Sequence, residues 1–211
     1  MQPLAGVRVV EAGQMISAPM AAVIMAEQGA EVIKVELADG VGDRMRQLGS
    51  QRNSMSALFN SVNRGKRSVT IDTKHPDGLQ ALLDLCATAD VFLQNFRPGA
   101  AERMGVGEAQ LRAVNPDIVY VSVSGFGSTG PKAEQKVYDY VIQAMTGMAD
   151  LQQGDTGAPQ LVRQFIVDTT TAITVSQAIT AVVDNDVLAS LGYEPERIVG
   201  LRASGVLGPT G

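Results

Sequence analysis

The sequence is poor in the side chains that carry redox and metal chemistry. Its 211 residues include one cysteine and one histidine. Because Cys86 is alone, it cannot form a disulfide within the chain, and its place in the pattern LLDLCATAD favours a buried thiol in a helix core. His75 stands beside Pro76 in a polar loop, so we interpret it as a surface residue and not as an acid or base. We predict no metal site.

The sequence also lacks long apolar runs and an excess of positive charge. No apolar run approaches the ~20 residues of a membrane-spanning helix, and no basic start followed by an apolar core marks a secretory signal. The net charge of −5 and the pI near 4.9 argue against a nucleic-acid surface. We expect a cytoplasmic protein with no membrane or nucleic-acid partner, which binds any anionic ligand through local clusters of cations.

Short β-branched runs alternate with helical patterns along most of the chain. Strands are predicted over residues 7–10, 31–36, 68–71, 91–94 and 118–123, and helices over 18–28, 77–87, about 108–114 and from 168 onward. This alternation is typical of an α/β protein with an open, mostly parallel sheet and helices on both faces. Residues 37–62 are polar and rich in arginine and glycine, and they are expected to form a long surface excursion.

The turn after the first strand lacks the glycines of a dinucleotide-binding fingerprint. The segment EAGQMISAPM has one glycine where that fingerprint needs three, so a pyrophosphate could not approach the backbone in the usual way. Glu36 ends the second strand, where a ribose-binding carboxylate would lie, but without the glycines we discount it. A dehydrogenase is therefore a poor interpretation.

Chemically distinctive side chains follow the predicted strands. Ligands of open α/β sheets gather outside the carboxyl ends of the strands. One aromatic ring, several cations and one carboxylate are expected there, which suits a ligand with a flat ring and phosphates, such as an acyl-CoA thioester. These residues are Lys74, Asn95, Phe96, Arg97, Lys132, Lys136 and Asp168. A further cluster of cations, Arg64, Lys66 and Arg67, is either part of such a site or a solvated hairpin edge, and charge alone does not decide.

Asp168 has two possible roles at the start of a predicted helix. The apolar run that ends at Val167 is followed by apolar residues at Ala172, Val175, Ile179 and Val182, a spacing that suits one helix face. Asp168 could be an N-cap that accepts hydrogen bonds from free backbone N–H groups. A partly desolvated carboxylate near a helix N-terminus could instead be a nucleophile.

Six runs of sequence resemble family III CoA-transferases: PLAGVRVVEAG, AEQGAEVIKVE, NRGKRSVTID, QNFRPGAAERMG, NPDIVYVSVSGFGSTGP and VYDYVIQAMTG. The resemblance covers nearly all of residues 3–183. It implies a Rossmann-like large domain, and a covalent aspartyl intermediate formed at the position of Asp168. It also implies that an acyl-CoA and a small carboxylic acid are the substrates, with no tightly bound cofactor.

The resemblance further implies which residues hold the CoA moiety. The matching positions are Ile16, Ser17, Ile71, Asp72, Thr73, Lys74, Asn95, Phe96, Arg97, Arg103 and Lys136. Two positions depart from formyl-CoA transferases, which have glutamine where this chain has Ile16 and arginine where it has Leu37. These departures argue against formyl-CoA as the substrate.

The resemblance extends to the α-methylacyl-CoA racemases of the same superfamily, which move a proton with a histidine and a carboxylate. This chain has Tyr138 at the position of that histidine. A tyrosine, which ionises near pH ~10, is a poor general base at neutral pH. We therefore predict that the α-proton of an acyl-CoA stays in place when the protein acts in deuterated water, and exchange detected by mass spectrometry would favour the racemase instead.

The last part of the chain resembles the segment that returns to the large domain in this family. Residues 1–183 are expected to form the large domain, and residues 184–211 a helical segment that packs back on it. The small domain that lies between these parts in the family is apparently absent, with the join near residues 183–186. A second hypothesis follows: an inactive CoA-binding or scaffold domain. A homodimer is expected, because excision of a domain would expose apolar surface.

Overall fold

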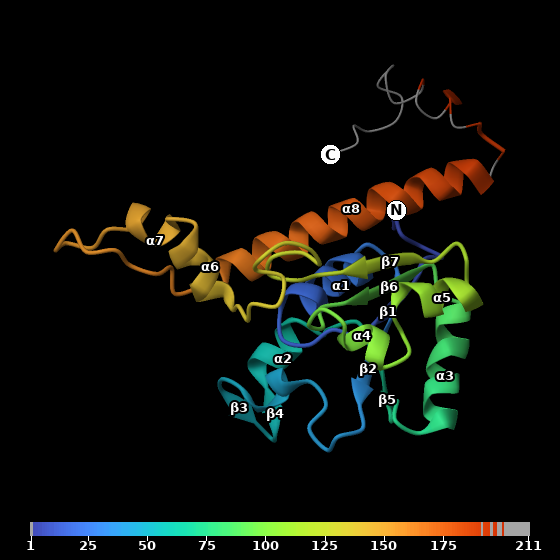
Figure 1. The fold of residues 1–211 in the computed structure, drawn as a ribbon, viewed down its shortest axis with the longest axis horizontal. Helices are drawn as coiled ribbons and strands as arrows, with labels where there is room; N and C mark the ends of the chain where they lie inside the picture. Colours follow the sequence, from blue (N-terminus) through green and yellow to red (C-terminus); the bar gives the residue numbers. More distant parts are fainter. Residues whose placement is uncertain (1, 191, 195, 198–199, 201–211) are drawn as a thin grey trace.

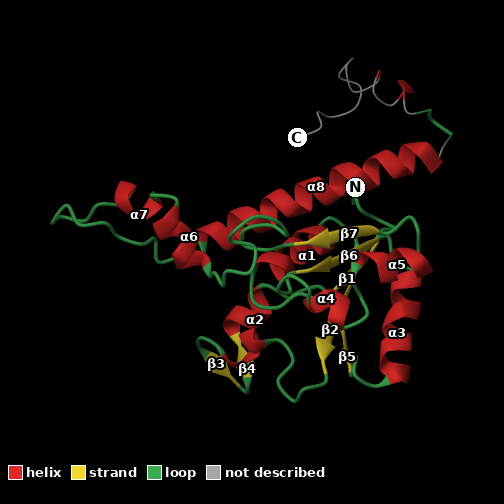
Figure 2. Ribbon diagram, in the orientation of Figure 1, coloured by secondary structure: helices red, strands yellow, loops and turns green. Residues whose placement is uncertain are grey.

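The computed structural model describes residues 2–190, 192–194, 196–197 and 200, and its centre is a five-stranded sheet (Figures 1 and 2). All four strand pairs in this sheet are parallel, and the strand order is β5-β2-β1-β6-β7. The strands are β1 (Arg8–Glu11), β2 (Glu31–Leu37), β5 (Arg67–Ile71), β6 (Val91–Gln94) and β7 (Val119–Ser122). This is the predicted open parallel sheet. Its order reverses between β1 and β6, as in doubly wound folds.

Helices cover both faces of the sheet, as predicted. One face carries α1 (Ser17–Glu27) and α8 (Ile166–Ser190), and the other carries α3 (Pro76–Ala87), α4 (Ala100–Arg103) and α5 (Glu108–Val114). Neighbouring strand residues point to opposite faces, so Val9 packs under α1 and α8 while Val10 packs under the other helices. The central strands are therefore buried on both sides, which explains their continuous apolar character.

The helix α8 begins at Ile166 and lies along α1 (Figure 1). Ala172 and Ile179 are buried and Val175 is half-buried, as the predicted stripe requires. Val182 was wrongly included in that stripe, because it is exposed and Val183 is buried in its place. The correction follows from the helical period, since four residues after Ile179 return closer to the buried face than three do.

The length and composition of α8 over Ile166–Val183 would also allow it to cross a membrane. This differs from our expectation that no segment resembles a membrane span. Core helices of soluble proteins meet the same two criteria, and one face of α8 packs on α1 and the sheet.

Residues 37–62 contribute to the core, so the predicted surface excursion is only partly correct. The segment contains η1 (Arg44–Gln47), a hairpin of β3 (Gln51–Arg52) and β4 (Met55–Ser56), and α2 (Ala57–Ser61). A small hydrophobic cluster joins Met45, Phe59 and Val62 of this region to Ile16. Elements this short show too little periodicity for a pattern of apolar residues to reveal them.

The predicted domain boundary near residue 183 falls inside α8, which continues to Ser190. The other helix predicted in the last segment, around residues 198 and 201, lies outside the described residues. An arm formed by α6 (Asp139–Met145) and α7 (Met148–Leu151) projects from the sheet beside the start of α8 (Figure 1).

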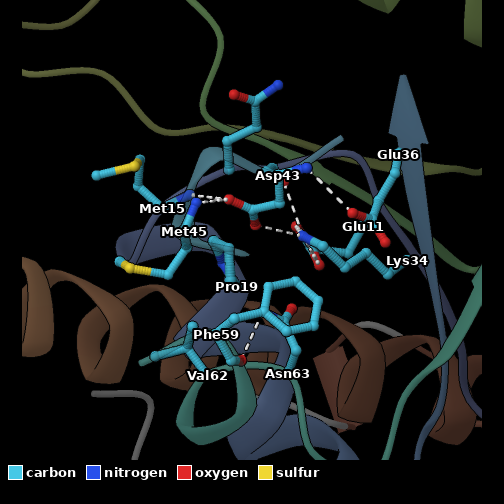
Figure 3. A network of polar contacts seen from close by, with 12 residues as sticks. Glu11, Met15, Pro19, Lys34, Glu36, Asp43, Met45, Phe59, Val62 and Asn63 are labelled. Carbon is cyan, nitrogen blue, oxygen red and sulfur yellow. Dashed lines mark hydrogen bonds and ion pairs between the residues drawn. The ribbon is translucent and has the colours of Figure 1, made fainter. Parts of the chain in front are cut away.

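A buried network of charges joins four segments beside the end of β1 (Figure 3). The Lys34 ammonium lies 2.9 Å from Asp43 and 3.4 Å from Glu11, and it donates to the Gly13 carbonyl at 3.0 Å. Lys66 lies 3.1 Å from Glu11. All four charged side chains have exposed fractions of 2% or less. We call Glu11, Lys34, Asp43 and Lys66 the buried charge network.

The cationic cluster around Gly65 is thus divided between two roles. Lys66 is a structural residue, because its ammonium also donates to the carbonyls of Pro19 at 2.8 Å and Val62 at 2.9 Å. Arg64 and Arg67 are exposed and form ion pairs at the surface. The solvated-edge interpretation is correct for the two arginines and wrong for Lys66.

We predict that Lys66→Ala destabilises the fold by roughly 3–5 kcal/mol, because removal of one member of a buried ion pair leaves the other with an uncompensated charge. The exposed neighbour provides the control, since Arg64→Ala is expected to cost about 1 kcal/mol or less. Chemical denaturation measures both free energies of unfolding. Equal effects of the two substitutions would contradict a structural role for Lys66.

Glu36 is buried beside this network and is expected to make the stability depend on pH. Burial alone would raise its pKa, but bonds from the Arg46 guanidinium, the Asp43 N–H group and the Ser68 hydroxyl lower it from 4.5 to about 2. The folded protein therefore binds this proton less readily than the unfolded chain. Stabilisation of roughly 3 kcal/mol at most is complete above pH 4.5 and is lost as the pH falls towards 2.

Glu36→Gln should remove this contribution, so that the free energy of unfolding falls less steeply between these pH values than in the wild type. An unchanged slope in denaturation experiments over that range would show that Glu36 is not the titrating group.

Candidate functional site

The two central strands β1 and β6 end side by side at the point where the strand order reverses. Asn95 follows β6 and clamps the turn that follows β1. Its Oδ1 accepts from the Gln14 N–H group at 2.8 Å, and its Nδ2 donates to the Gln14 carbonyl at 2.8 Å and to the Ser17 hydroxyl at 3.3 Å. We call this place, formed by residues 13–17 and Asn95, the switch-point turn.

The switch-point turn is tightly packed and strained. A Cβ atom at Gly13 would lie 2.7 Å from the Ala18 side chain, so only glycine fits there. Met15 has a φ of 67°, a left-handed conformation that costs a methionine about 1–3 kcal/mol. Its N–H group donates to Asp43 Oδ1 at 3.1 Å (Figure 3). The buried charge network therefore holds the turn in shape.

Asp168 lies in the first turn of α8, and Ser17 of the switch-point turn is close enough to its side chain to affect its pKa. Its side chain is half-buried, and this desolvation raises the pKa of the carboxyl group above its usual value. The negative charge of Asp139 raises the pKa further, whereas a hydrogen bond with the Ser17 side chain lowers it. The carboxylate of Asp168 thus lies next to the first residue of α1, at the end of the central strands.

Asp139, and not Asp168, caps the start of α8. The N–H groups of Val167 and Asp168 donate to Asp139 Oδ2 at 2.7 and 2.9 Å. The capping role that we considered for Asp168 is therefore filled from α6. Sequence reasoning missed Asp139, because its capping contact spans 29 residues and no local pattern marks it.

The predicted binding segment 71–74 follows the edge strand β5. Ile71 is buried in the core, whereas Asp72 and Lys74 are exposed, and Asp72 accepts a hydrogen bond from the Lys74 N–H group at 3.0 Å. Ile71 lies two strands across from β1 and three residues beyond the level of Glu11, so the end of β5 is roughly 14 Å from the end of β1. This spacing lets Lys74 reach a ligand that extends from the switch-point turn along the carboxyl ends of the strands.

Three more predicted cations lie near the carboxyl ends of the strands. Arg97 follows β6, Arg103 ends α4, and Lys136 lies in the loop between β7 and α6; all three are exposed. Within the described part of the chain, neither these side chains nor Lys74 forms an ion pair. Their charges are available to a polyanionic ligand such as the phosphates of CoA.

The other predicted binding positions differ in how accessible their side chains are to a ligand. Phe96 is half-buried against the core, and its N–H group donates to Gln94 Oε1 at 2.5 Å. Ile16 is buried in the cluster with Met45 and Phe59, so its side chain packs inside the protein and does not line the rim. Thr73 is half-buried in the turn before α3.

The other reactive residue types have structural places. Burial raises the pKa of the Cys86 thiol to about 12, which makes it unreactive. His75 is exposed and accepts a hydrogen bond from the Asp77 N–H group at 3.2 Å, at the start of α3. Among the described residues, no group of three His, Cys, Asp or Glu side chains could hold a metal ion.

Comparison with known proteins gives matches to one family. The family model of CoA-transferase family III matches residues 4–186. The chain is 37% identical over 186 residues to the succinate–glutarate CoA-transferase of Agrobacterium fabrum, covering 85% of this chain and 46% of that protein. It is 39% identical over 158 residues to the β subunit of the succinyl-CoA–L-malate CoA-transferase of Chloroflexus aurantiacus, covering 74% and 39%.

The fold is similar to that of a solved relative. The crystal structure of a CAIB/BAIF family protein from Brucella suis matches with a TM-score of 0.83 and 32% identity, covering 97% of this chain and 58% of that chain. The chain spans less than half the length of the two curated relatives. From the match to the family model and the parallel sheet, we conclude that the chain belongs to CoA-transferase family III.

Proposed function

We propose that this chain carries the CoA-binding and nucleophilic part of an enzyme that moves CoA from an acyl-CoA thioester to a carboxylic acid. The observation that carries the proposal is the place of Asp168. Its half-buried carboxylate is not needed as a helix cap, because Asp139 fills that role, and it lies near Ser17 at the carboxyl ends of the strands. The exposed cations at these strand ends form no ion pair within the described part of the chain. A carboxylate in such a place is suited to attack an acyl group whose CoA lies along that edge.

The proposed reaction has two halves. In the first, the Asp168 carboxylate attacks the thioester carbonyl, the C–S bond breaks, and CoA leaves as a thiolate from a mixed anhydride. The thiolate then attacks the aspartyl carbonyl, which releases the first carboxylate and leaves an aspartyl-CoA thioester. In the second half, the incoming carboxylate attacks this thioester and expels the thiolate. The thiolate attacks the acyl carbonyl of the new anhydride, forming the new acyl-CoA and restoring Asp168.

The environment of Asp168 supports this role. Burial and the nearby charge of Asp139 raise its pKa, and a carboxylate of higher pKa is a stronger base and a better nucleophile. Partial removal from water also lowers the cost of desolvation when the thioester arrives. The exposed cations at Lys74, Arg97 and Lys136 would hold the phosphates and so fix the position of the thioester.

Dicarboxylic acids are the first acceptors to test. The two relatives described above are named for the transfer of CoA among succinate, glutarate and malate. We therefore propose succinyl-CoA as the donor and glutarate or malate as the acceptor.

Asp168→Asn should abolish transfer and leave CoA binding nearly unchanged, because it removes the nucleophile and keeps the shape of the side chain. Mass spectrometry after incubation with succinyl-CoA and hydroxylamine measures the modified residue, and calorimetry measures CoA binding. Asp117→Asn, at an exposed position before β7, serves as the control and should behave as the wild type. Near-normal turnover of Asp168→Asn would overturn the assignment.

A CoA-binding or scaffold domain without turnover is the second candidate. The exposed cations at Lys74, Arg97 and Lys136 would favour CoA binding even if Asp168 did not react. This candidate predicts that calorimetry detects CoA binding while no adduct forms at Asp168 with any acyl-CoA tested.

We also propose that the chain associates with a second copy. Large apolar side chains are exposed on the arm beside α8, including Tyr138 at 70% and Leu151 at 84%. Exposed apolar groups on one projecting element support an interface there. The Chloroflexus relative is named as one of two subunits, so assembly with a different chain is the competing outcome.

A further inference from the structure

Two buried polar side chains lie one helical turn apart on α6. Asp139 is 5% exposed and Gln143 is fully buried. The Gln143 amide donates to Asp139 Oδ1 at 2.5 Å and to the Val162 carbonyl at 3.3 Å, while its own oxygen accepts from the Val162 N–H group at 2.8 Å. Gln143 is thus fixed by the backbone of the segment before α8, and it fixes one oxygen of Asp139.

The other oxygen of Asp139 is directed at the helix that carries Asp168. It accepts from the N–H groups of Val167 and Asp168 at 2.7 and 2.9 Å. These groups belong to the first turn of a 25-residue helix and have no partner within it. A carboxylate at this helix end is favoured by both hydrogen bonds and the helix dipole.

The contact has a direct consequence for Asp168. An aspartate near a helix start commonly uses its own carboxylate to accept such N–H groups. Because Asp139 accepts them, the carboxylate of Asp168 is not needed as a cap, and the Ser17 side chain of α1 lies close enough to lower its pKa. Among the described residues, Asp139 on α6 and Ser17 on α1 are the groups whose charge or hydrogen bonding acts on Asp168.

We infer that Asp139, oriented by Gln143, is a positioning residue for the nucleophile: it caps α8 in place of Asp168 and leaves the Asp168 carboxylate directed at the switch-point turn. This inference rests on the proposed function. The negative charge of Asp139 also makes Asp168 a stronger base than it would otherwise be. Asp168 alone reacts with the substrate.

The electrostatic part is tested by nuclear magnetic resonance on the full chain with ¹³C-labelled aspartate, with Asp168 assigned through the Asp168→Asn spectrum. Asp139→Asn removes the charge and keeps an oxygen for the two N–H groups. The titration midpoint of Asp168 should then move to lower pH, because loss of a neighbouring negative charge favours the ionised form. Glu108→Gln removes an exposed carboxylate from the first turn of α5 and should leave the midpoint unchanged. An unchanged midpoint in Asp139→Asn would overturn this part.

The geometric part has two readouts. Asp139→Ala should slow adduct formation at Asp168 roughly 10–100-fold, the cost of a misplaced reacting group, while CoA affinity stays the same. In the wild type, the amide protons of Val167 and Asp168 should shift during an acid titration, because both donate to a carboxylate. This measurement needs no variant to fold. Wild-type adduct rates in Asp139→Ala, or amide protons insensitive to that titration, would overturn the cap. If the wild type forms no adduct, the proposed function fails, yet both titrations still judge the role of Asp139.

Discussion

The buried charge network is the constraint on which the rest of the site depends. Two carboxylates and two ammonium groups meet inside the protein, and they come from the end of β1, from β2, from the segment after β2 and from the residue before β5. Since buried charges are stable only when they are paired and hydrogen-bonded, these four segments must come together for any of them to be stable. The network therefore joins the end of β1, the middle of β2, the segment after β2 and the start of β5 into one unit.

The consequence is a rigid turn where the strand order reverses. Asp43 accepts the N–H groups of Met15 and Met45, so one buried carboxylate holds both the strained turn and the segment that covers it (Figure 3). Asp139 has a similar role at the start of α8. Its carboxylate accepts two backbone N–H groups of the helix that carries Asp168. In both cases a buried carboxylate accepts backbone N–H groups and fixes an element near Asp168.

The parts of the fold predicted from sequence are those with strong local patterns. The parallel strands follow from continuous β-branched runs, and α5 and β6 begin and end where their patterns predict. The apolar run before Asp168 places it at a helix start, whereas its role as the nucleophile follows from the family resemblance and stays a prediction. Asp139, Gln143 and Lys66 could not be assigned in this way, because the partners that bury them, Val167 and Asp168, Val162 and Glu11, lie 19 or more residues away in the sequence. A polar residue in a turn or helix also shows no local sign of burial. The buried side chain of Ile16 was missed for the same reason, since its partners lie in the segment after β2.

The carboxyl ends of the strands are proposed to form one CoA-binding surface that leads to Asp168. The most direct measurement is a map of backbone amide shifts in the ¹⁵N-labelled protein as coenzyme A is added. The account predicts that the largest changes fall on residues 71–74, 95–97 and 136 and on the switch-point turn, and that they reach Asp168. Changes confined to other surfaces, or none at millimolar coenzyme A, would contradict it.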